Sequence, residues 1–179
     1  MRTREIDLQN QEYKDEAFER EIVPHVHSLY TFGYWLTHND DDAKDLMQDT
    51  LIKAYKYFSY YEEGTNAKSW LFRIMKNNFL NNKQKQARTP QLVDVEDVRI
   101  NFGSTQFNES LLKIDGAGFG DEVVEALNSI PENLKTVFLL KYLHEFKYHE
   151  IAELYHMPIG TVKIWLHRAK KLLKLKIES

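Results

Sequence analysis

Residues 148 to 174 read YHEIAELYHMPIGTVKIWLHRAKKLLK, and their apolar residues have the spacing of two helices joined by a short turn. We expect the first helix at 148–155, the turn at 156–158 and a second helix from Ile159 onward. Pro158 suits the first turn of a helix because its fixed φ is already helical. This stretch predicts a helix-turn-helix, a motif whose second helix enters the major groove of DNA.

The second of these helices divides into an apolar and a basic face. The face expected to pack inward carries Val162, Leu166, Ala169 and Leu173. The outward face carries Gly160, Lys163, Ile164, His167, Lys171 and Lys174, with Arg168 at its edge. Residues 157–177 contain 6 bases and no acid, which favours a surface that lies against phosphate. A surface amphipathic hairpin is the alternative, because the turn lacks its usual glycine and has His156 in that region.

Charge is distributed unevenly along the chain. The formal net charge is -3, yet residues 64–93 contain 6 bases and no acid. Residues 1–63 contain 14 acids against 7 bases, and residues 94–125 contain 8 acids against 2 bases. The acidic total therefore does not exclude nucleic acid as a partner, because two basic segments lie within an acidic chain.

The pattern along the chain predicts an all-α fold of two small helical domains joined by a flexible linker. Helical spacing runs from Phe18 to about Gln84 and again from Val123 to Ile177, without a convincing period of two. Between them, a segment with Pro90 and several glycines has no sustained period, and its length is unusual inside one compact domain. The expected boundaries are 1–87 for the first domain, 88–121 for the linker and 122–179 for the second domain.

Composition excludes several classes of site. The 179 residues include no cysteine, so neither a disulfide framework nor a thiolate metal site is possible. No run approaches the roughly 18 apolar residues of a membrane helix, and the amino terminus lacks an apolar signal core. We therefore expect a cytoplasmic protein without membrane insertion.

A helix with two different faces is expected to begin near Ala43, with the aspartates at 40–42 as its caps. The packed face comprises Ala43, Leu46, Met47, Thr50, Leu51, Ala54, Tyr57 and Phe58. The polar face comprises Asp45, Gln48, Asp49, Ile52, Lys53 and Lys56. Such a face is either solvated, as on most surface helices, or presented to a partner.

The same segment also matches a sequence motif that belongs to a different function. Residues 41–45 read DDAKD, which is the aspartate-rich pattern by which helical prenyl-diphosphate enzymes hold magnesium. That site needs a second acidic motif across a large cavity. We find no second motif, and the chain is short for such a cavity, so we do not expect this magnesium enzyme. The expectation for the chain as a whole is no metal, no cofactor and no enzymatic activity.

A second helix, expected to be capped by Asn66, combines aromatic and basic residues. One side carries Ala67, Trp70, Leu71, Ile74 and Asn78. The other carries Arg73, Lys76, Asn77, Leu80, Lys83 and Gln84. Cations and amides in an acid-free stretch suit phosphate and base edges. Nearby rings, namely Tyr57, Phe58, Tyr60, Tyr61, Phe72 and Phe79, either stack on unpaired bases or belong to the core.

Together these motifs resemble the extracytoplasmic-function (ECF) sigma factors, the smallest members of the bacterial primary sigma family. The resemblance is specific in three places: DAKDLMQDT at 42–50, GTNAKSWLFRI at 64–74, and EIAEL at 150–154 followed by PIGTVK at 158–163 and LHRA at 166–169. It covers nearly the whole chain. The fold that it implies is two all-α domains, called regions two and four.

The resemblance implies a sigma factor that binds core RNA polymerase through the β′ clamp and the β flap, recognises promoter DNA and initiates transcription. By position, the clamp-binding residues are Asp45, Gln48, Asp49, Ile52 and Lys53. At the minus-ten element, a loop at 61–69 is expected to catch unpaired bases. The residues that the resemblance assigns to this element are Tyr61, Thr65, Asn66, Lys68, Trp70, Arg73, Lys76 and Asn77. Residues for the minus-thirty-five element are Gly160, Thr161, Lys163, Ile164, His167, Arg168 and Lys171.

The resemblance also implies an anti-sigma partner. The sequence at 64–70 and 158–162 most resembles the branch of the family that is controlled by zinc-containing anti-sigma proteins. One departure is that Ile164 and Trp165 follow Lys163, where the family commonly has a small polar residue and an arginine. We expect Ile164 to contact a thymine methyl group instead. The alternative function is a helix-turn-helix regulator that binds duplex DNA without polymerase.

Overall fold

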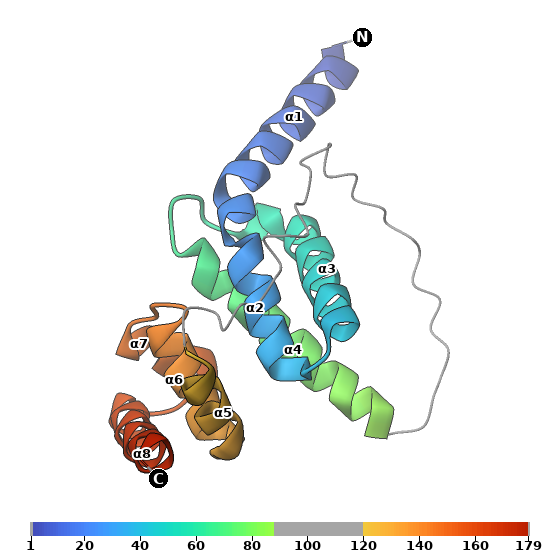
Figure 1. The fold of residues 1–179 in the computed structure, drawn as a ribbon. Helices are drawn as coiled ribbons and strands as arrows, with labels where there is room; N and C mark the ends of the chain where they lie inside the picture. The colour runs from blue at the N-terminus through green and yellow to red at the C-terminus, as the bar shows by residue number, and fades with distance from the viewer. Residues whose placement is uncertain (1, 88–119, 179) are drawn as a thin grey trace. The chain divides into compact units, whose positions relative to one another are not determined.

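The computed structural model describes residues 2–87 and 120–178, and all the regular elements in these two segments are helices. The chain divides into two compact units (Figure 1). The all-α prediction is confirmed. The linker predicted at 88–121 lies outside the described residues except for its last two positions.

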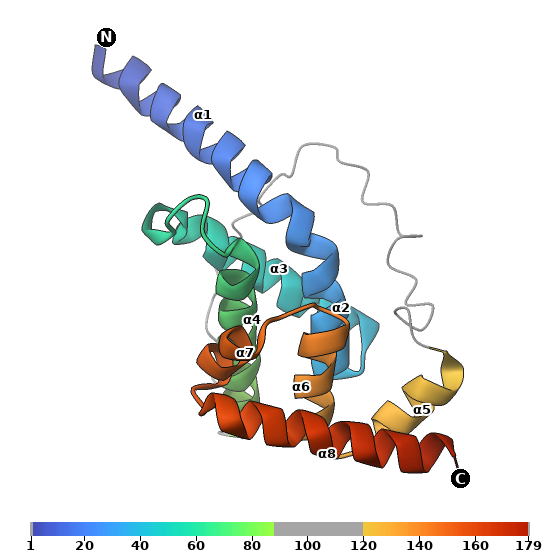
Figure 2. The ribbon, with the colours of Figure 1, turned by 90° about the vertical axis from the view of Figure 1, so that its left-hand side faces the viewer.

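The first unit is built on three packed helices, α2, α3 and α4, and a longer helix, α1, whose amino-terminal part projects beyond them (Figures 1 and 2). Its elements are α1 (Arg2–Ile22), η1 (Val23–His25), α2 (Val26–Thr37), α3 (Asp40–Lys56), η2 (Phe58–Tyr60) and α4 (Ala67–Ala87). Helix α1 begins well before Phe18, where the apolar spacing starts. Its amino-terminal part was not predicted from the sequence.

Aromatic and aliphatic side chains fill the centre of this unit. The rings of Phe32 on α2 and Phe72 on α4 stack with centroids 4.7 Å apart. Gly33 permits the close approach of α2 to α3, because a Cβ there would lie 3.3 Å from the carbonyl oxygen of Ala43. The expected inner face of α3 is buried at Ala43, Leu46, Met47, Thr50, Leu51 and Ala54. Phe58 is buried as well, but Tyr57 is exposed.

The amino termini of α3 and α4 are fixed by asparagine caps. Asn39, and not the aspartates that follow it, caps α3, since its Oδ1 accepts a hydrogen bond from the Asp42 amide at 3.0 Å. The aspartates at 40–42 lie in the first turn, where they favourably oppose the positive end of the helix dipole. Asn66 accepts a bond from the Ser69 amide at 3.0 Å, which confirms its predicted capping role.

The second unit consists of three shorter helices packed against the last one (Figure 2). They are α5 (Asp121–Ser129), α6 (Glu132–Tyr142), α7 (Tyr148–Tyr155) and α8 (Ile159–Ile177). Helices α7 and α8 form the predicted helix-turn-helix with the predicted bounds. Pro158 is the N-cap of α8 rather than a residue of its first turn.

The turn between α7 and α8 is made without glycine. His156 occupies the left-handed region, with φ of 50° and ψ of 45°, as the C-cap of α7. The His156 amide donates to the Glu153 carbonyl, and the Met157 amide donates to the Ala152 carbonyl at 3.0 Å. This is the conformation in which helices commonly end on glycine. His156 therefore takes the role that the sequence pattern normally assigns to glycine.

Candidate functional site

The outer face of α3 presents acidic and polar side chains, as predicted. Asp45, Gln48 and Asp49 are exposed and Ile52 is half-buried, while the opposite side of the helix is in the core. Lys53 differs from this group, because its amine donates to Oδ1 of Asn78 on α4 at 2.5 Å. Asn78 is buried, so the Lys53 amine also contributes to the packing of α3 on α4.

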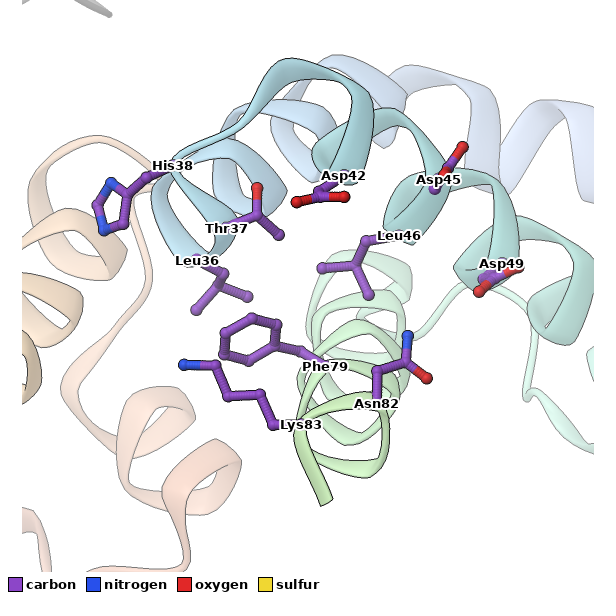
Figure 3. A pocket seen from close by; sticks show the side chains of 10 residues that line it. All are labelled: Leu36, Thr37, His38, Asp42, Asp45, Leu46, Asp49, Phe79, Asn82 and Lys83. Carbon is purple, nitrogen blue, oxygen red and sulfur yellow. The ribbon is translucent and has the colours of Figure 1, made fainter. Parts of the chain in front are cut away.

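A groove of about 440 Å³ runs beside this acidic face (Figure 3). It is lined by Leu36 and Thr37 at the end of α2 and by its C-cap His38, by Asp42, Asp45, Leu46 and Asp49 of α3, and by Phe79, Asn82 and Lys83 of α4. In Figure 3, the Phe79 ring projects between Leu36 and Leu46, and the carboxylates follow α3 along one rim. Such a groove suits a cationic side chain with an aliphatic stem.

The electrostatics of the groove centre on Asp49. Partial burial raises the pKa of this carboxyl group above its usual value, opposed by the attraction of Lys53. The charge of Asp45 raises it further, and that of Lys85 lowers it. On the other wall, the Lys83 amine lies 4.5 Å from the centroid of the Phe79 ring. A partially desolvated carboxylate gains more from an incoming cation than a fully hydrated one does.

A second cavity lies where the loop after η2 enters α4. It has a volume of about 660 Å³ and is lined by Arg20, Glu21, Pro24, His25, Gly64, Thr65, Asn66, Ala67 and Lys68. Gly64 is needed in this loop because its φ is +77°. The cavity contains Thr65, Asn66 and Lys68, which the sequence motif predicted. It also contains four residues from α1 and η1, which the motif did not indicate.

Burial also affects a histidine in this cavity. The pKa of His25 is lowered, first by burial and then by the cation of Lys68, against the opposing charge of Glu21. The imidazole is therefore favoured in its neutral form, in which it offers one donor and one acceptor. Together with Thr65 and Asn66, it makes the cavity able to hydrogen-bond an uncharged polar group such as a base edge.

The aromatic residues near this loop divide into buried and exposed sets. Tyr61 is 8% exposed, and its ring packs 5.5 Å from that of Phe58 and 5.0 Å from that of Trp70. Of the two alternatives left open for these rings, the Tyr61 ring belongs to the core, where the hydrophobic effect favours it. Phe72 is also fully buried. Tyr57 and Tyr60 are exposed, Tyr60 to 84%, and Phe79 is half-buried in the wall of the groove.

The outer face of α4 is basic and amide-rich, as expected. Arg73, Asn77 and Lys83 are exposed, and Trp70 and Lys76 are half-buried. The pKa of Lys76 is lowered, first by its partial burial and then by the charge of Arg73. A phosphate placed beside this pair would relieve their repulsion.

Helix α8 separates its two faces as the sequence predicted. Val162, Leu166, Ala169 and Leu173 are buried. The outward residues Gly160, Lys163, Ile164, His167, Arg168, Lys171 and Lys174 are exposed, and Thr161 is half-buried. Ile164 is 54% exposed and lies among these cations. The helix thus presents cations around an exposed aliphatic group.

Two further properties concern the described residues as a whole. No helix among them is long and apolar enough to cross a membrane. Within 2–87 and 120–178, no three potential metal ligands are grouped so that they could hold an ion.

Two family models match the chain. Residues 22–89 match Sigma-70 region 2, and residues 120–173 match Sigma-70, region 4. The first match covers α2, α3 and α4, and the second covers α5 to α7 and most of α8.

Curated proteins resemble the chain over most of its length. It is 28% identical over 173 residues to the ECF RNA polymerase sigma factor SigW of Bacillus subtilis, covering 92% of this chain and 90% of that protein. It is 28% identical over 142 residues to the ECF RNA polymerase sigma-E factor of Escherichia coli, covering 76% of this chain and 74% of that protein.

Solved structures share the fold. The sigma factor RpoE of Bartonella quintana, determined in complex with the anti-sigma factor NepR, matches with a TM-score of 0.66 and 26% identity, over 90% of this chain and 96% of that one. CnrH in complex with the cytosolic domain of CnrY matches with a TM-score of 0.62, over 92% of this chain and 89% of that one, at 17% identity. The latter likeness concerns the fold alone.

Proposed function

Because the chain belongs to the sigma-70 family and is an RNA polymerase sigma factor of the ECF type, we propose that its two helical units divide promoter recognition between them. The first domain, 1–87, binds core polymerase and reads the minus-ten element. The second, 122–179, reads the minus-thirty-five element. The observation that carries this division is the match of the region 2 and region 4 models to separate units.

The polymerase-binding surface is the acidic face of α3 with the adjoining groove. Asp45, Gln48, Asp49 and Ile52 face a partner, and Lys53 contributes chiefly by holding α3 to Asn78. The β′ clamp would supply the cationic side chain that the groove accommodates. Charge complementarity of this kind speeds association and fixes the register of the partner.

The minus-ten surface combines the loop cavity with the basic face of α4. Thr65, Asn66 and Lys68 line the cavity, which has the polar lining that an unpaired base requires. Arg73, Lys76 and Asn77 continue from it along α4 and contact the phosphate backbone. Trp70 supports the loop through its packing against Tyr61, so these two rings act on DNA through the shape of the loop.

The minus-thirty-five surface is the exposed face of α8. Gly160 lets the start of the helix approach DNA closely, because no side chain intervenes there. Thr161, Lys163, Ile164 and His167 face base edges, while Arg168 and Lys171 contact phosphate. The β flap of polymerase binds this same domain away from its DNA face.

The proposed role includes an anti-sigma partner and a cytoplasmic location. Support for the partner is the similarity to RpoE, whose structure was determined with the anti-sigma factor NepR. Support for the location is the requirement for core polymerase. Assignment to the branch with zinc-containing anti-sigma proteins stays a prediction. The protein contributes binding energy to strand separation, and nucleotide chemistry belongs to the polymerase.

The test is reconstitution with core RNA polymerase. The full chain should co-purify with core enzyme and start transcripts from upstream sequences that are shared among the genes induced on its overexpression. Asp49→Arg should weaken core binding while circular dichroism stays unchanged, because Asp49 lies on the exposed face. Glu12→Arg, an equal charge change on the exposed part of α1, is the control. Normal core affinity of a folded Asp49→Arg protein would refute the polymerase surface.

The same reconstitution separates the alternative function. A free-standing regulator would protect a duplex site from nuclease digestion without polymerase and would not direct transcript initiation. A sigma factor gives start sites only with core enzyme.

A further inference from the structure

Two carboxylates hold the loop between η2 and α4 against α1. Nη2 of Arg20 lies 2.9 Å from Oε2 of Glu63 in the loop, and the Tyr13 hydroxyl donates to the same carboxylate at 3.1 Å. Glu21 of α1 accepts a bond from the Tyr61 hydroxyl at 3.1 Å and from the Gly64 amide at 3.4 Å. The loop is thus bonded to α1 at Tyr61 and at two neighbouring residues of its tip, Glu63 and Gly64.

Helix α1 is itself fixed by contacts with another element. The hydroxyl of Tyr55 on α3 donates to Oδ1 of Asp15 at 2.6 Å, and the amine of Lys14 lies 4.3 Å from the centroid of the Tyr55 ring. Phe18 is buried and meets Tyr55 edge to face. Because these contacts do not involve the loop, α1 forms a separately anchored support for it.

The tip of the loop has little packing of its own. Glu62, Glu63, Gly64 and Thr65 are exposed, and a Cβ built at Gly64 would meet nothing within 4 Å. Local bonds, such as that from the Thr65 hydroxyl to the Glu62 carbonyl at 2.6 Å, shape the turn. The hydroxyl of the buried Tyr61 also donates to the Thr65 carbonyl at 3.1 Å, which ties the Thr65 end of the loop to the core. The bonds to α1 constrain the loop at Glu63 and Gly64.

We propose that α1 is a positioning strut for the loop that reads unpaired minus-ten DNA, acting through Arg20–Glu63 and Glu21–Gly64. The inference rests on the proposed function of this loop. An unrestrained loop must lose conformational entropy when DNA binds, whereas a loop held in its binding shape has already lost it. Arg20, Tyr13 and Glu21 are positioning residues, and the strut favours the bases whose edges fit the preformed cavity.

Replacing Glu63 distinguishes a positioning role of this residue from a purely electrostatic one. Glu63 is a negative group beside a surface for polyanionic DNA, so electrostatics alone predicts that Glu63→Ala tightens binding to every sequence. The strut predicts weaker selection of preferred bases. Breaking this partly exposed cluster should lower the enrichment of preferred over disfavoured bases by about two- to fivefold.

The experiment uses the full chain assembled with core polymerase and a pool of single-stranded DNA 12-mers of randomised sequence. Retained DNA is sequenced, and base enrichment is compared between variants. Arg20→Glu with Glu63→Arg should restore much of the enrichment lost in Glu63→Ala, because the ion pair is re-formed with reversed charges. Tyr55→Phe removes a hydroxyl hydrogen bond of α1 but keeps the ring that contacts Phe18 and Lys14 and holds α1 in place, so it is the matched control and should leave enrichment near normal. Core affinity should be unchanged in all four proteins.

Hydrogen exchange in the full chain alone supplies a readout without DNA. The Gly64 amide should exchange faster in Glu63→Ala and in Glu21→Ala, which removes its acceptor, than in the native protein. Unchanged exchange, or unchanged or stronger enrichment in Glu63→Ala, overturns the strut. If Asn66→Ala and Lys68→Ala also leave enrichment unchanged, the proposed reading role of the loop has failed, and exchange at Gly64 still decides whether α1 positions it.

Discussion

The amine of Lys53 on the polar face of α3 donates a hydrogen bond to the amide oxygen of Asn78, a buried residue of α4, at 2.5 Å. The other end of the Asn78 amide donates to the Thr50 hydroxyl at 3.4 Å. A residue on the proposed polymerase surface therefore also satisfies a polar group in the core. Effects of Lys53 substitutions on polymerase binding need to be separated from effects on the domain itself.

Lys53→Met should destabilise the first domain because it leaves the Asn78 oxygen without its donor. An unsatisfied buried polar group costs about 1 to 3 kcal/mol. Urea unfolding followed by circular dichroism measures the change. Lys56→Met, one turn later on the same helix, is the control, since Lys56 lies over the exposed Tyr57 ring at 5.6 Å. An equal decrease in the free energy of unfolding of the two variants would show that the Lys53–Asn78 hydrogen bond does not contribute to stability.

Asp49→Asn should stabilise the first domain at neutral pH. Burial raises the pKa of Asp49 in the folded state, so its charged form is less favourable there than in the unfolded chain. The gain from removing the charge is fully present above the raised folded-state pKa and disappears as the pH falls through it towards the unfolded value. Urea midpoints across the acidic range test this. Gln48→Ala is the control, because it changes no titrating group and should alter the free energy of unfolding equally at every pH. A pH-independent change in Asp49→Asn would contradict the effect of burial on the Asp49 pKa.

His156→Gly should stabilise the second domain by about 1 kcal/mol, because glycine adopts the left-handed region without the Cβ clash that histidine suffers. His156 has φ of 50°. Glu153→Gly, inside α7 and also exposed, should instead destabilise by about 1 kcal/mol through helix propensity. Thermal melting of both proteins measures the two opposite shifts. A lower melting temperature for His156→Gly would mean that the histidine side chain makes a compensating contact.

Lys163 and Lys171 should contribute differently to binding of a minus-thirty-five duplex. Lys171→Ala should reduce the log–log salt slope of binding by about one unit with little change in sequence preference. Lys163→Ala should relax preference at one base pair. Titrations of the holoenzyme with matched and single-substituted duplexes at several salt concentrations separate the two. If Lys163→Ala lowers the binding affinity equally for all duplex sequences, Lys163 contacts phosphate rather than a base.

Ile164 should read a methyl group in the groove. Replacing the contacted thymine by uracil removes that methyl and should weaken binding to the native protein by about 0.8 kcal/mol, the value of one buried methylene-sized group. Ile164→Ala should show little further response to uracil, because the contact is already lost. Competition binding with uracil at each thymine position identifies the site. Full and equal uracil sensitivity in both proteins would exclude this contact.

Features that depend on neighbours along the chain were predictable from the sequence. The buried positions Val162, Leu166 and Ala169 follow from the helical period, because the direction of each side chain is set by its place in the turn. The Asn66 cap bonds an amide only three positions away. The outer face of α3 and the bounds of α7 and α8 were read in the same way. The family motifs added the roles expected of these faces.

Features that join distant segments required the tertiary structure. Arg20 and Glu63 are 43 positions apart, and nothing in their local spacing indicates that they meet. The groove joins Leu36, Asp49 and Phe79 from three helices. The sequence left the Tyr61 ring between a base-stacking and a core role, and it is buried because η2 and α4 pack Phe58 and Trp70 against it. Local sequence determines which side of a helix is apolar, whereas burial against particular partners depends on how the helices pack, a balance of forces spread over the whole domain.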